Sequence, residues 1–236
     1  MHLPRKITWV FCIIFALPLL AAKPSENICS GTVSSLATDA REPGRVFANG
    51  IKVTGDSIYP LQTVLRHLGM ANEDVSQLRE KDVLLVAEGF SGLLPHLLAN
   101  GCSRVEAVDV WYHQENIPTE GDGVRMREYI QKFGKNLVRG DALSLPFASE
   151  SKDFVVSHLL VHHLPATYQA ATMEMLRVLR RGGTARIFGY IELPGYFIAD
   201  LRSQGYVVNT SSSVVKLHPG GKTLFWPLSL LVVNKI

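Results

Sequence analysis

The sequence predicts an α/β fold with a doubly wound, mostly parallel seven-stranded sheet that ends in an antiparallel hairpin. Short β-rich runs alternate with helical stretches, which is the pattern of a parallel sheet covered by helices. The run at 83–86 is continuously apolar, as burial on both faces of a sheet requires. Two strand-like runs close the chain with only a Pro/Gly-rich stretch between them, which favours an antiparallel pair at the sheet edge.

The elements follow from hydrophobic periodicity. Leu61, Val64, Leu65 and Leu68 recur at helical spacing until Gly69 interrupts the pattern, so a helix is expected before the first strand. We expect parallel strands at 82–87, 105–110, 136–139, 154–157 and 185–190, helices at 93–100, 126–133 and 166–180, and closing strands at 205–217 and 229–233, joined by residues 218–221.

Composition favours a single domain. With 236 residues, of which 47% are hydrophobic and 19% charged, the chain can bury one substantial core. Residues 23–58 are rich in Ser, Thr, Pro, Gly and Asn and read as a linker, which leaves 59–236 as the domain. The net charge of +3 comes from scattered Lys and Arg, so no nucleic-acid partner is expected.

The N-terminus has the layout of an export signal. Two basic residues precede an uncharged apolar run at 7–20, and two alanines follow it. The run is shorter than the roughly 20 residues that a membrane-spanning helix needs, which favours a cleaved signal peptide at 1–22. The alternative is a retained anchor that associates with the membrane through residues 7–22. In both cases the domain is expected outside the cytoplasm, periplasmic or secreted.

Three cysteines leave the redox state open. Cys12 would depart with a cleaved signal, which leaves Cys29 and Cys102. We expect two free thiols, with one disulfide as the alternative, because spacing alone does not show that the two residues meet.

The segment 83–92 is the first candidate binding element. It runs from a buried strand through a small-residue turn, Ala87-Glu88-Gly89-Phe90-Ser91, into a helix. Small residues let a ligand approach the backbone, and the helix N-terminus offers unpaired amides to a polar group. The alternative is a glycine that the turn needs for steric reasons alone.

Two carboxylates follow the next strands. Asp109 ends the second strand, where an acid can accept both hydroxyls of a ribose, or simply cap the following loop. Asp141 follows the third strand and could accept the exocyclic amine of adenine, while the backbone amide of Ala142 donates to the ring.

These motifs together resemble class I S-adenosylmethionine-dependent methyltransferases. The resemblance rests on the strand and small turn, the strand ending in Asp109, Gly-Asp-Ala-Leu-Ser-Leu-Pro-Phe at 140–147, Asp-Phe-Val-Val-Ser at 153–157 and Arg-Val-Leu-Arg-Arg-Gly-Gly at 177–183. It runs from about residue 81 to the C-terminus and is closest to the small-molecule branch that includes ubiquinone and menaquinone biosynthetic enzymes. It implies a Rossmann-like methyltransferase fold and S-adenosylmethionine as cofactor.

The resemblance also implies roles for single residues. The family usually shows Asp-x-Gly-x-Gly-x-Gly, whereas Leu85, Ala87 and Ser91 stand here at the places of the acid and of the first and third glycines. Glu88 could supply the missing carboxylate to the methionine ammonium. By position, the methionine part would face Ala87, Glu88, Gly89 and Ser91, the ribose Asp109 and Val110, the adenine Asp141 and Ala142, and the sulfonium Ser157 and His158.

Histidine and aromatic residues add two open questions. His162 and His163 are the candidates for a general base or for metal ligands, although the same pair can serve as a helix-start element. No Cys or carboxylate joins them at ligand spacing, so no metal site is expected. Trp111 and Tyr112 could stack on adenine or pack in the core.

The resemblance implies a methyltransferase acting by in-line transfer on a small-molecule or lipid-like acceptor. The alternative is an exported methyltransferase-like binding or structural protein that has lost catalysis, because the donor is made in the cytosol. A nicotinamide dehydrogenase fits the Gly-Asp-Ala segment at 140–142 and the terminal hairpin poorly, and it fits the glycine pattern no better. The acceptor would be chosen by residues before 59 and by the segment 191–203.

Overall fold

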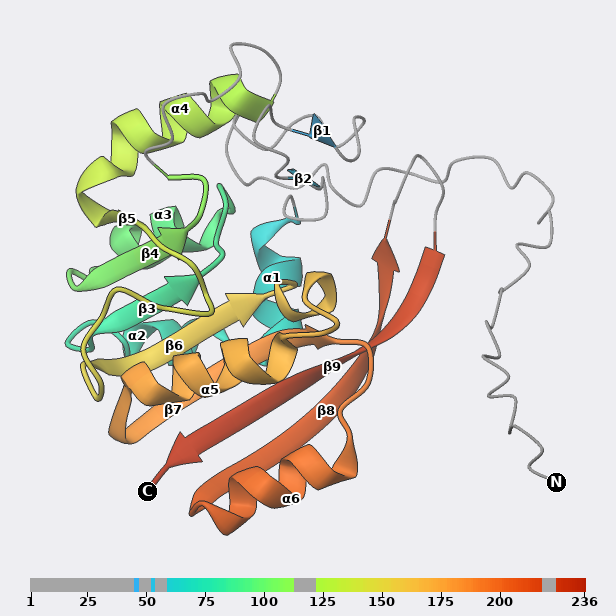
Figure 1. Cartoon of the computed structure of the whole chain (residues 1–236). Helices are drawn as coiled ribbons and strands as arrows, with labels where there is room; N and C mark the ends of the chain where they lie inside the picture. The colour runs from blue at the N-terminus through green and yellow to red at the C-terminus, as the bar shows by residue number, and fades with distance from the viewer. Residues whose placement is uncertain (1–44, 47–51, 54–58, 113–121, 218–223) are drawn as a thin grey trace, which may run out of the picture.

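A computed structural model describes residues 45–46, 52–53, 59–112, 122–217 and 224–236. Its main sheet has seven strands in the order β5-β4-β3-β6-β7-β9-β8 (Figure 1). The bounds of these strands are β3 Val83–Val86, β4 Val105–Asp109, β5 Leu137–Arg139, β6 Lys152–His158, β7 Leu179–Tyr190, β8 Tyr206–Leu217 and β9 Leu224–Lys235.

The pairing pattern confirms the predicted fold class. Strands β3 to β7 pair in parallel, whereas β9 is antiparallel to both β7 and β8. The helices are α1 Leu61–His67, α2 Asn72–Ser76, α3 Leu93–Ala99, α4 Asp122–Phe133, α5 Tyr168–Val178 and α6 Gly195–Ser203, with short 3-10 turns η3 Gly134–Asn136 and η4 Val161–His163.

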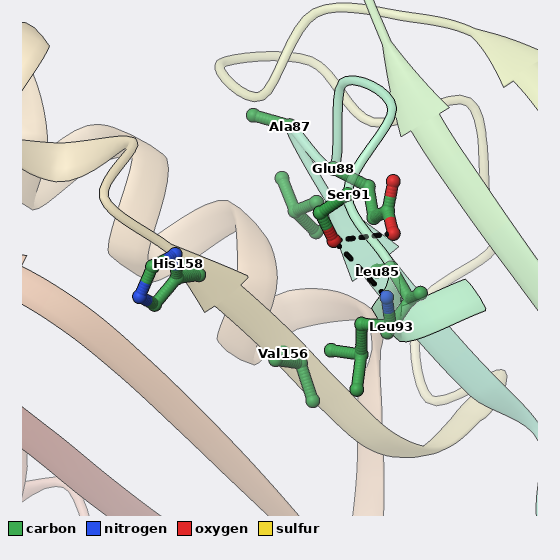
Figure 2. Close-up of a pocket in the computed structure, with 8 residues that line it drawn as sticks. Leu85, Ala87, Glu88, Ser91, Leu93, Val156 and His158 are labelled. Atoms are coloured by element: carbon green, nitrogen blue, oxygen red, sulfur yellow. Dashed lines mark hydrogen bonds between the residues drawn. The ribbon is translucent and has the colours of Figure 1, made fainter. Parts of the chain in front are cut away.

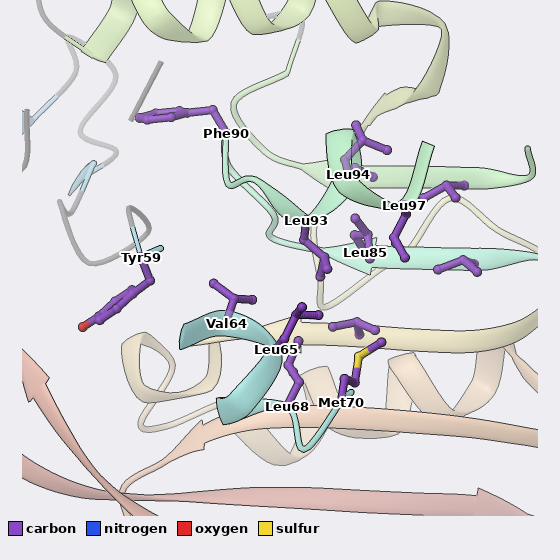
Figure 3. Close-up of a cluster of buried hydrophobic side chains, with 14 of the residues drawn as sticks. Tyr59, Val64, Leu65, Leu68, Met70, Leu85, Phe90, Leu93, Leu94 and Leu97 are labelled. Atoms are coloured by element: carbon purple, nitrogen blue, oxygen red, sulfur yellow. The ribbon is translucent and has the colours of Figure 1, made fainter. Parts of the chain in front are cut away.

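Two hydrophobic layers lie on opposite faces of the sheet. Because side chains alternate along a strand, Val83 and Leu85 face a core shared with α1, α3 and α4 (Figure 3). Leu84 and Val86 face the other core, which α5 and α6 complete. All four side chains are buried, which is why this strand reads as a continuous apolar run.

The two largest boundary differences from the sequence-based expectation are the starts of β7 and β9. Strand β7 begins at Leu179, six residues before the expected start at 185, because a register shift accommodates the Arg-Arg-Gly-Gly segment between the pairs Lys152↔Leu179 and Phe154↔Thr184. Strand β9 begins before the expected 229 and contains Pro227. A proline is tolerated there because the pairing of β9 with β7 begins only at Ser229, so Pro227 pairs with β8 alone.

Several sequence-based expectations fall on segments outside the described residues. These include the export signal at 1–22, Cys29 and most of the expected linker, although two-residue strands β1 Arg45–Val46 and β2 Lys52–Val53 pair within the linker. In the described part of the chain, no helix is long and apolar enough to cross a membrane. Cys102 is a buried free thiol.

Candidate functional site

The turn between β3 and α3 has an unusual backbone. Ala87 and Gly89 both adopt positive φ, 54° and 62°, in the left-handed region. Glycine adopts this conformation without a steric penalty, but an L-residue with a Cβ is disfavoured there by roughly 1–2 kcal/mol. Ala87 therefore holds strain at the place of the family's first glycine, and strained backbone of this kind concentrates at functional sites.

The Glu88 carboxylate is buried and fully engaged inside the protein. One oxygen, Oε1, accepts hydrogen bonds from the Ser91 hydroxyl at 2.7 Å and from the Leu94 backbone N–H at 3.1 Å, at the start of α3. The other, Oε2, accepts from the Tyr129 hydroxyl of α4 at 3.1 Å. Burial raises the pKa of Glu88 to about 8. Glu88 thus links the turn to α3 and α4 through hydrogen bonds. Its role toward a methionine ammonium stays a prediction.

Asp109 is also buried, at the end of β4. Its oxygens accept the backbone N–H groups of Gly89 and Trp111, each at 3.0 Å. Burial raises the pKa of Asp109 to about 6, against the opposing effect of these hydrogen bonds. Tyr112 donates its hydroxyl to the Gly89 carbonyl at 2.6 Å and is completely buried, so it packs in the core rather than stacking on a ligand.

A small pocket opens between the β3–α3 turn and the end of β6 (Figure 2). Its volume is about 20 Å³, room for one or two water molecules. Four of the residues predicted from sequence meet there. The lining residues are Leu85, Val86, Ala87, Glu88, Ser91, Leu93, Val156 and His158.

Other predicted residues lie at the carboxyl ends of neighbouring strands. Val110 is 37% exposed directly after β4, and Asp141 is exposed shortly after β5, where its Oδ1 accepts the Leu143 N–H at 2.9 Å. Ala142 is buried in the core beside α5. Ser157 is buried too, and its Oγ has no hydrogen-bond partner. Asp141 therefore lies in an exposed turn after β5 that its own side chain stabilises, whereas Ser157 is buried within strand β6.

His67 is the residue that sequence analysis missed. It comes from the last turn of α1 and is hydrogen-bonded to His158, which lines the pocket. His67 is three residues after Val64 and so lies on the apolar face of α1. A histidine at an apolar position of the helical pattern is the sequence signal that could have identified it. The candidates His162 and His163 lie on η4, with ring centroids 3.6 Å apart, and His163 is exposed.

The fold and the site together define a doubly wound α/β domain with a small-residue turn and an acid at the ends of adjacent strands. Residues 84–187 match the methyltransferase domain family. A protein of Encephalitozoon cuniculi assigned as a methyltransferase is 44% identical over 57 residues, which are 23% of this chain and 27% of that protein. The chain thus matches about a quarter of the length of this relative.

Solved structures share the fold. A protein of Pyrococcus horikoshii assigned as an RNA methyltransferase has a TM-score of 0.54 at 15% identity, over 83% of this chain and 92% of that one. A structure that describes the conversion of a disulfide bond into a thioacetal group in echinomycin biosynthesis has a TM-score of 0.52 at 16% identity, over 84% of each chain. At these identities the two structures show a shared fold, and the ubiquinone-like branch stays a prediction.

Proposed function

We propose that this chain is an S-adenosylmethionine-dependent methyltransferase that acts on a small-molecule or lipid-like acceptor. The observation that carries the proposal is the pocket at the strained turn of Ala87 and Gly89, with His158 on its opposite wall. The match of residues 84–187 to methyltransferase domains supports it. The comparisons lend no support to the alternative, a binding or structural protein without catalysis.

The residues present fit such a cofactor. A carboxylate has about four acceptor positions, so Asp109 retains capacity for a ribose hydroxyl beside its backbone partners Gly89, Trp111 and Val110. Val110 and Leu143 are apolar yet 37% and 40% exposed, and both follow strands that end at the same edge. We propose that they contact the purine ring. The pocket is large enough only for the part of the cofactor nearest the β3–α3 turn. The rest of the cofactor would extend along the carboxyl ends of β4 and β5.

The chemistry asks little of the protein. When bound, S-adenosylmethionine supplies an activated methyl group on a sulfonium, and alignment with an acceptor atom is the main requirement. Ala87 and Gly89 would let the methionine part approach the backbone, Asp109 would orient the ribose, and Asp141 would accept the adenine amine. The exposed Ile191 and Tyr196, in the segment 191–203, are candidates for contacts with the acceptor.

Calorimetric titration of the full-length chain, in mild detergent, with S-adenosylmethionine and S-adenosylhomocysteine tests the proposal. Asp141→Ala is the informative variant because Asp141 is exposed, and we expect roughly tenfold weaker binding from one lost charged hydrogen bond. Asp74→Ala is the matched control, since Asp74 is half-buried and also accepts a nearby backbone N–H, from Ala71. A natively folded chain that binds neither compound would exclude the proposed function.

We further propose that residues 1–22 direct the domain out of the cytoplasm, through a cleaved signal or a retained anchor. The supporting feature is the basic pair before the apolar run at 7–20. Cell fractionation with N-terminal sequencing tests this. A mature chain that begins near residue 23 supports cleavage, a full-length chain in the membrane fraction supports the anchor, and a full-length chain in the cytosol contradicts both.

A further inference from the structure

Two histidines, His67 buried and His158 half-buried, form a pair at the pocket. Nδ1 of His67 lies 3.0 Å from Nε2 of His158, and the two ring planes differ by 14°. The ring of Phe188 stacks on both imidazoles, with centroid distances of 4.6 and 5.6 Å. Tyr59 packs edge-on against both, at 5.7 and 5.6 Å. One ring donates and the other accepts, and the aromatic rings of Tyr59 and Phe188 flank the pair.

The backbone after His158 is strained. Leu159 has a φ of 64°, which is uncommon for a non-glycine residue, and its N–H donates to the Phe188 carbonyl at 2.8 Å. A Cβ on Gly189, whose φ is 122°, would lie 2.9 Å from the Leu159 Cα. The backbone directly after His158 therefore lies so close to β7 that a residue with a Cβ does not fit at position 189 without a shift. Such strain persists where the surrounding structure fixes a side chain in a particular orientation.

We infer that His158 accepts the proton that leaves the methyl acceptor, and that His67 positions the His158 ring for this step. This inference rests on the proposed function and deepens it. It requires the tautomer in which His158 carries its proton on Nε2 and donates it to Nδ1 of His67, because only then does His158 Nδ1 keep a lone pair. His67 then acts as the partner that fixes the tautomer of a base.

The step balances in atoms and charge. An acceptor oxygen or nitrogen forms a bond to the methyl carbon, the carbon–sulfur bond breaks with its electron pair going to sulfur, and the acceptor's proton passes to Nδ1 of His158. The positive charge thereby moves from the sulfonium to the imidazole pair, so the net charge of the pocket does not change. A base is needed only when the acceptor atom carries a proton. The acceptor is therefore a compound whose attacking atom carries a proton, and the class we infer is a hydroxyl or an N–H compound.

The surroundings keep the pair neutral before transfer. Burial lowers the pKa of His158 well below its usual value, with His67 and His162 adding to the effect. Burial, and to a smaller extent Arg66, lowers the pKa of His67 to about 4. Across the pocket stands Glu88, whose own pKa is raised to about 8. Both imidazoles are thus unprotonated near neutral pH, and His158 is available to accept a proton.

Nitrogen-15 spectroscopy of histidine-labelled full-length chain tests the tautomer without an acceptor. At neutral pH we expect His158 to carry its proton on Nε2, and saturating S-adenosylhomocysteine to shift its Nδ1 signal. His67→Asn keeps an acceptor oxygen near the position of Nδ1 and should preserve the tautomer, whereas His67→Leu should abolish the preference. His96→Leu, on α3, is the matched control and should leave the His158 signals unchanged.

The outcomes separate the inference from the proposed function. A proton on Nδ1 of His158, or the same tautomer preference in both His67 variants, overturns the inference outright. If calorimetry shows S-adenosylhomocysteine binding but His158 does not respond, the base assignment fails and the proposed function stands. If there is no binding to folded chain, the proposed function falls, and the pair is then a structural element of the core.

Discussion

The backbone N–H of Gly89 donates to the carboxylate of Asp109 at 3.0 Å, which ties the β3–α3 turn to the end of β4. The same carboxylate accepts the N–H of Trp111. Asp109 therefore has a structural task in the protein alone, before any cofactor is considered. This is why its removal does not cleanly report on ligand binding.

Asp109→Ala is expected to lower the free energy of unfolding by about 1–3 kcal/mol, because two buried backbone amides lose their acceptor. Urea denaturation measures the effect. Asp200→Ala, at an exposed position on α6, is the control and should stay within about 0.5 kcal/mol of the original chain. An unchanged midpoint for Asp109→Ala would show that the turn does not depend on this carboxylate.

Stability should depend on pH through Glu88. Burial raises its pKa from 4.5 to about 8, so between these values the folded chain holds a proton that the unfolded chain releases. The resulting stability is complete below pH 4.5 and is lost as the pH rises through 8. Asp109, with its pKa raised from 3.8 to about 6, acts in the same direction at lower pH. Above pH 6.5 Glu88 is the larger of the two effects.

The histidine pair acts in the opposite direction. Its lowered pKa values mean that the unfolded chain binds protons more readily below pH 6.5, the ordinary value, so acidification destabilises the fold there. Above pH 6.5 the histidines no longer contribute to the pH dependence. The free energy of unfolding should therefore fall by about 1–2 kcal/mol between pH 6.5 and 8, and this fall is due to Glu88.

Glu88→Gln should remove this loss and leave the profile below pH 4.5 unchanged. The amide can still accept from Ser91 and Leu94 and can donate to the Tyr129 oxygen. Thermal melts at a series of pH values give the comparison, with Glu128→Gln, an exposed position on α4, as the control. The same alkaline loss in Glu88→Gln as in the original chain would contradict the assignment.

Ala87→Gly should stabilise the fold by about 0.5–1 kcal/mol. The substitution relieves the left-handed strain at φ 54°, and the extra freedom of glycine in the unfolded chain offsets part of the gain. Ala170→Gly, at an exposed position in α5, provides the contrast, because helical glycine costs about 1 kcal/mol. Equal losses in the two variants would show that the Ala87 backbone is not strained.

Gly189→Ala should destabilise the fold by roughly 2–3 kcal/mol, since both its positive φ and the Leu159 backbone oppose a methyl group. Gly195→Ala is the control because a Cβ there meets nothing within 4 Å. Chemical denaturation distinguishes the two. We also expect Gly189→Ala to disturb the nitrogen-15 signals of His158, and unchanged signals together with native stability would remove the support that the strained backbone gives to the proton-acceptor inference.

Sequence patterns predicted the elements where the physical signal is local. The apolar run at 83–86, the strand ending in Asp109 and the terminal hairpin all follow from burial and turn chemistry along the chain. The start of β7 could not be placed in this way, because the register shift depends on its pairing with β6. Local propensity does not report on such long-range pairing.

For this protein the sequence by itself determined the fold class, the turn at Gly89 and the acids at the strand ends. These features depend on strand and helix periodicity and on small-residue turns, which residues close together in the chain specify. Only the tertiary structure decided what the polar groups contact. It turned Glu88 inward to α3 and α4 and brought His67 to His158, 91 residues away in the chain. Contacts of this kind depend on how the layers pack against the sheet, which no local pattern specifies.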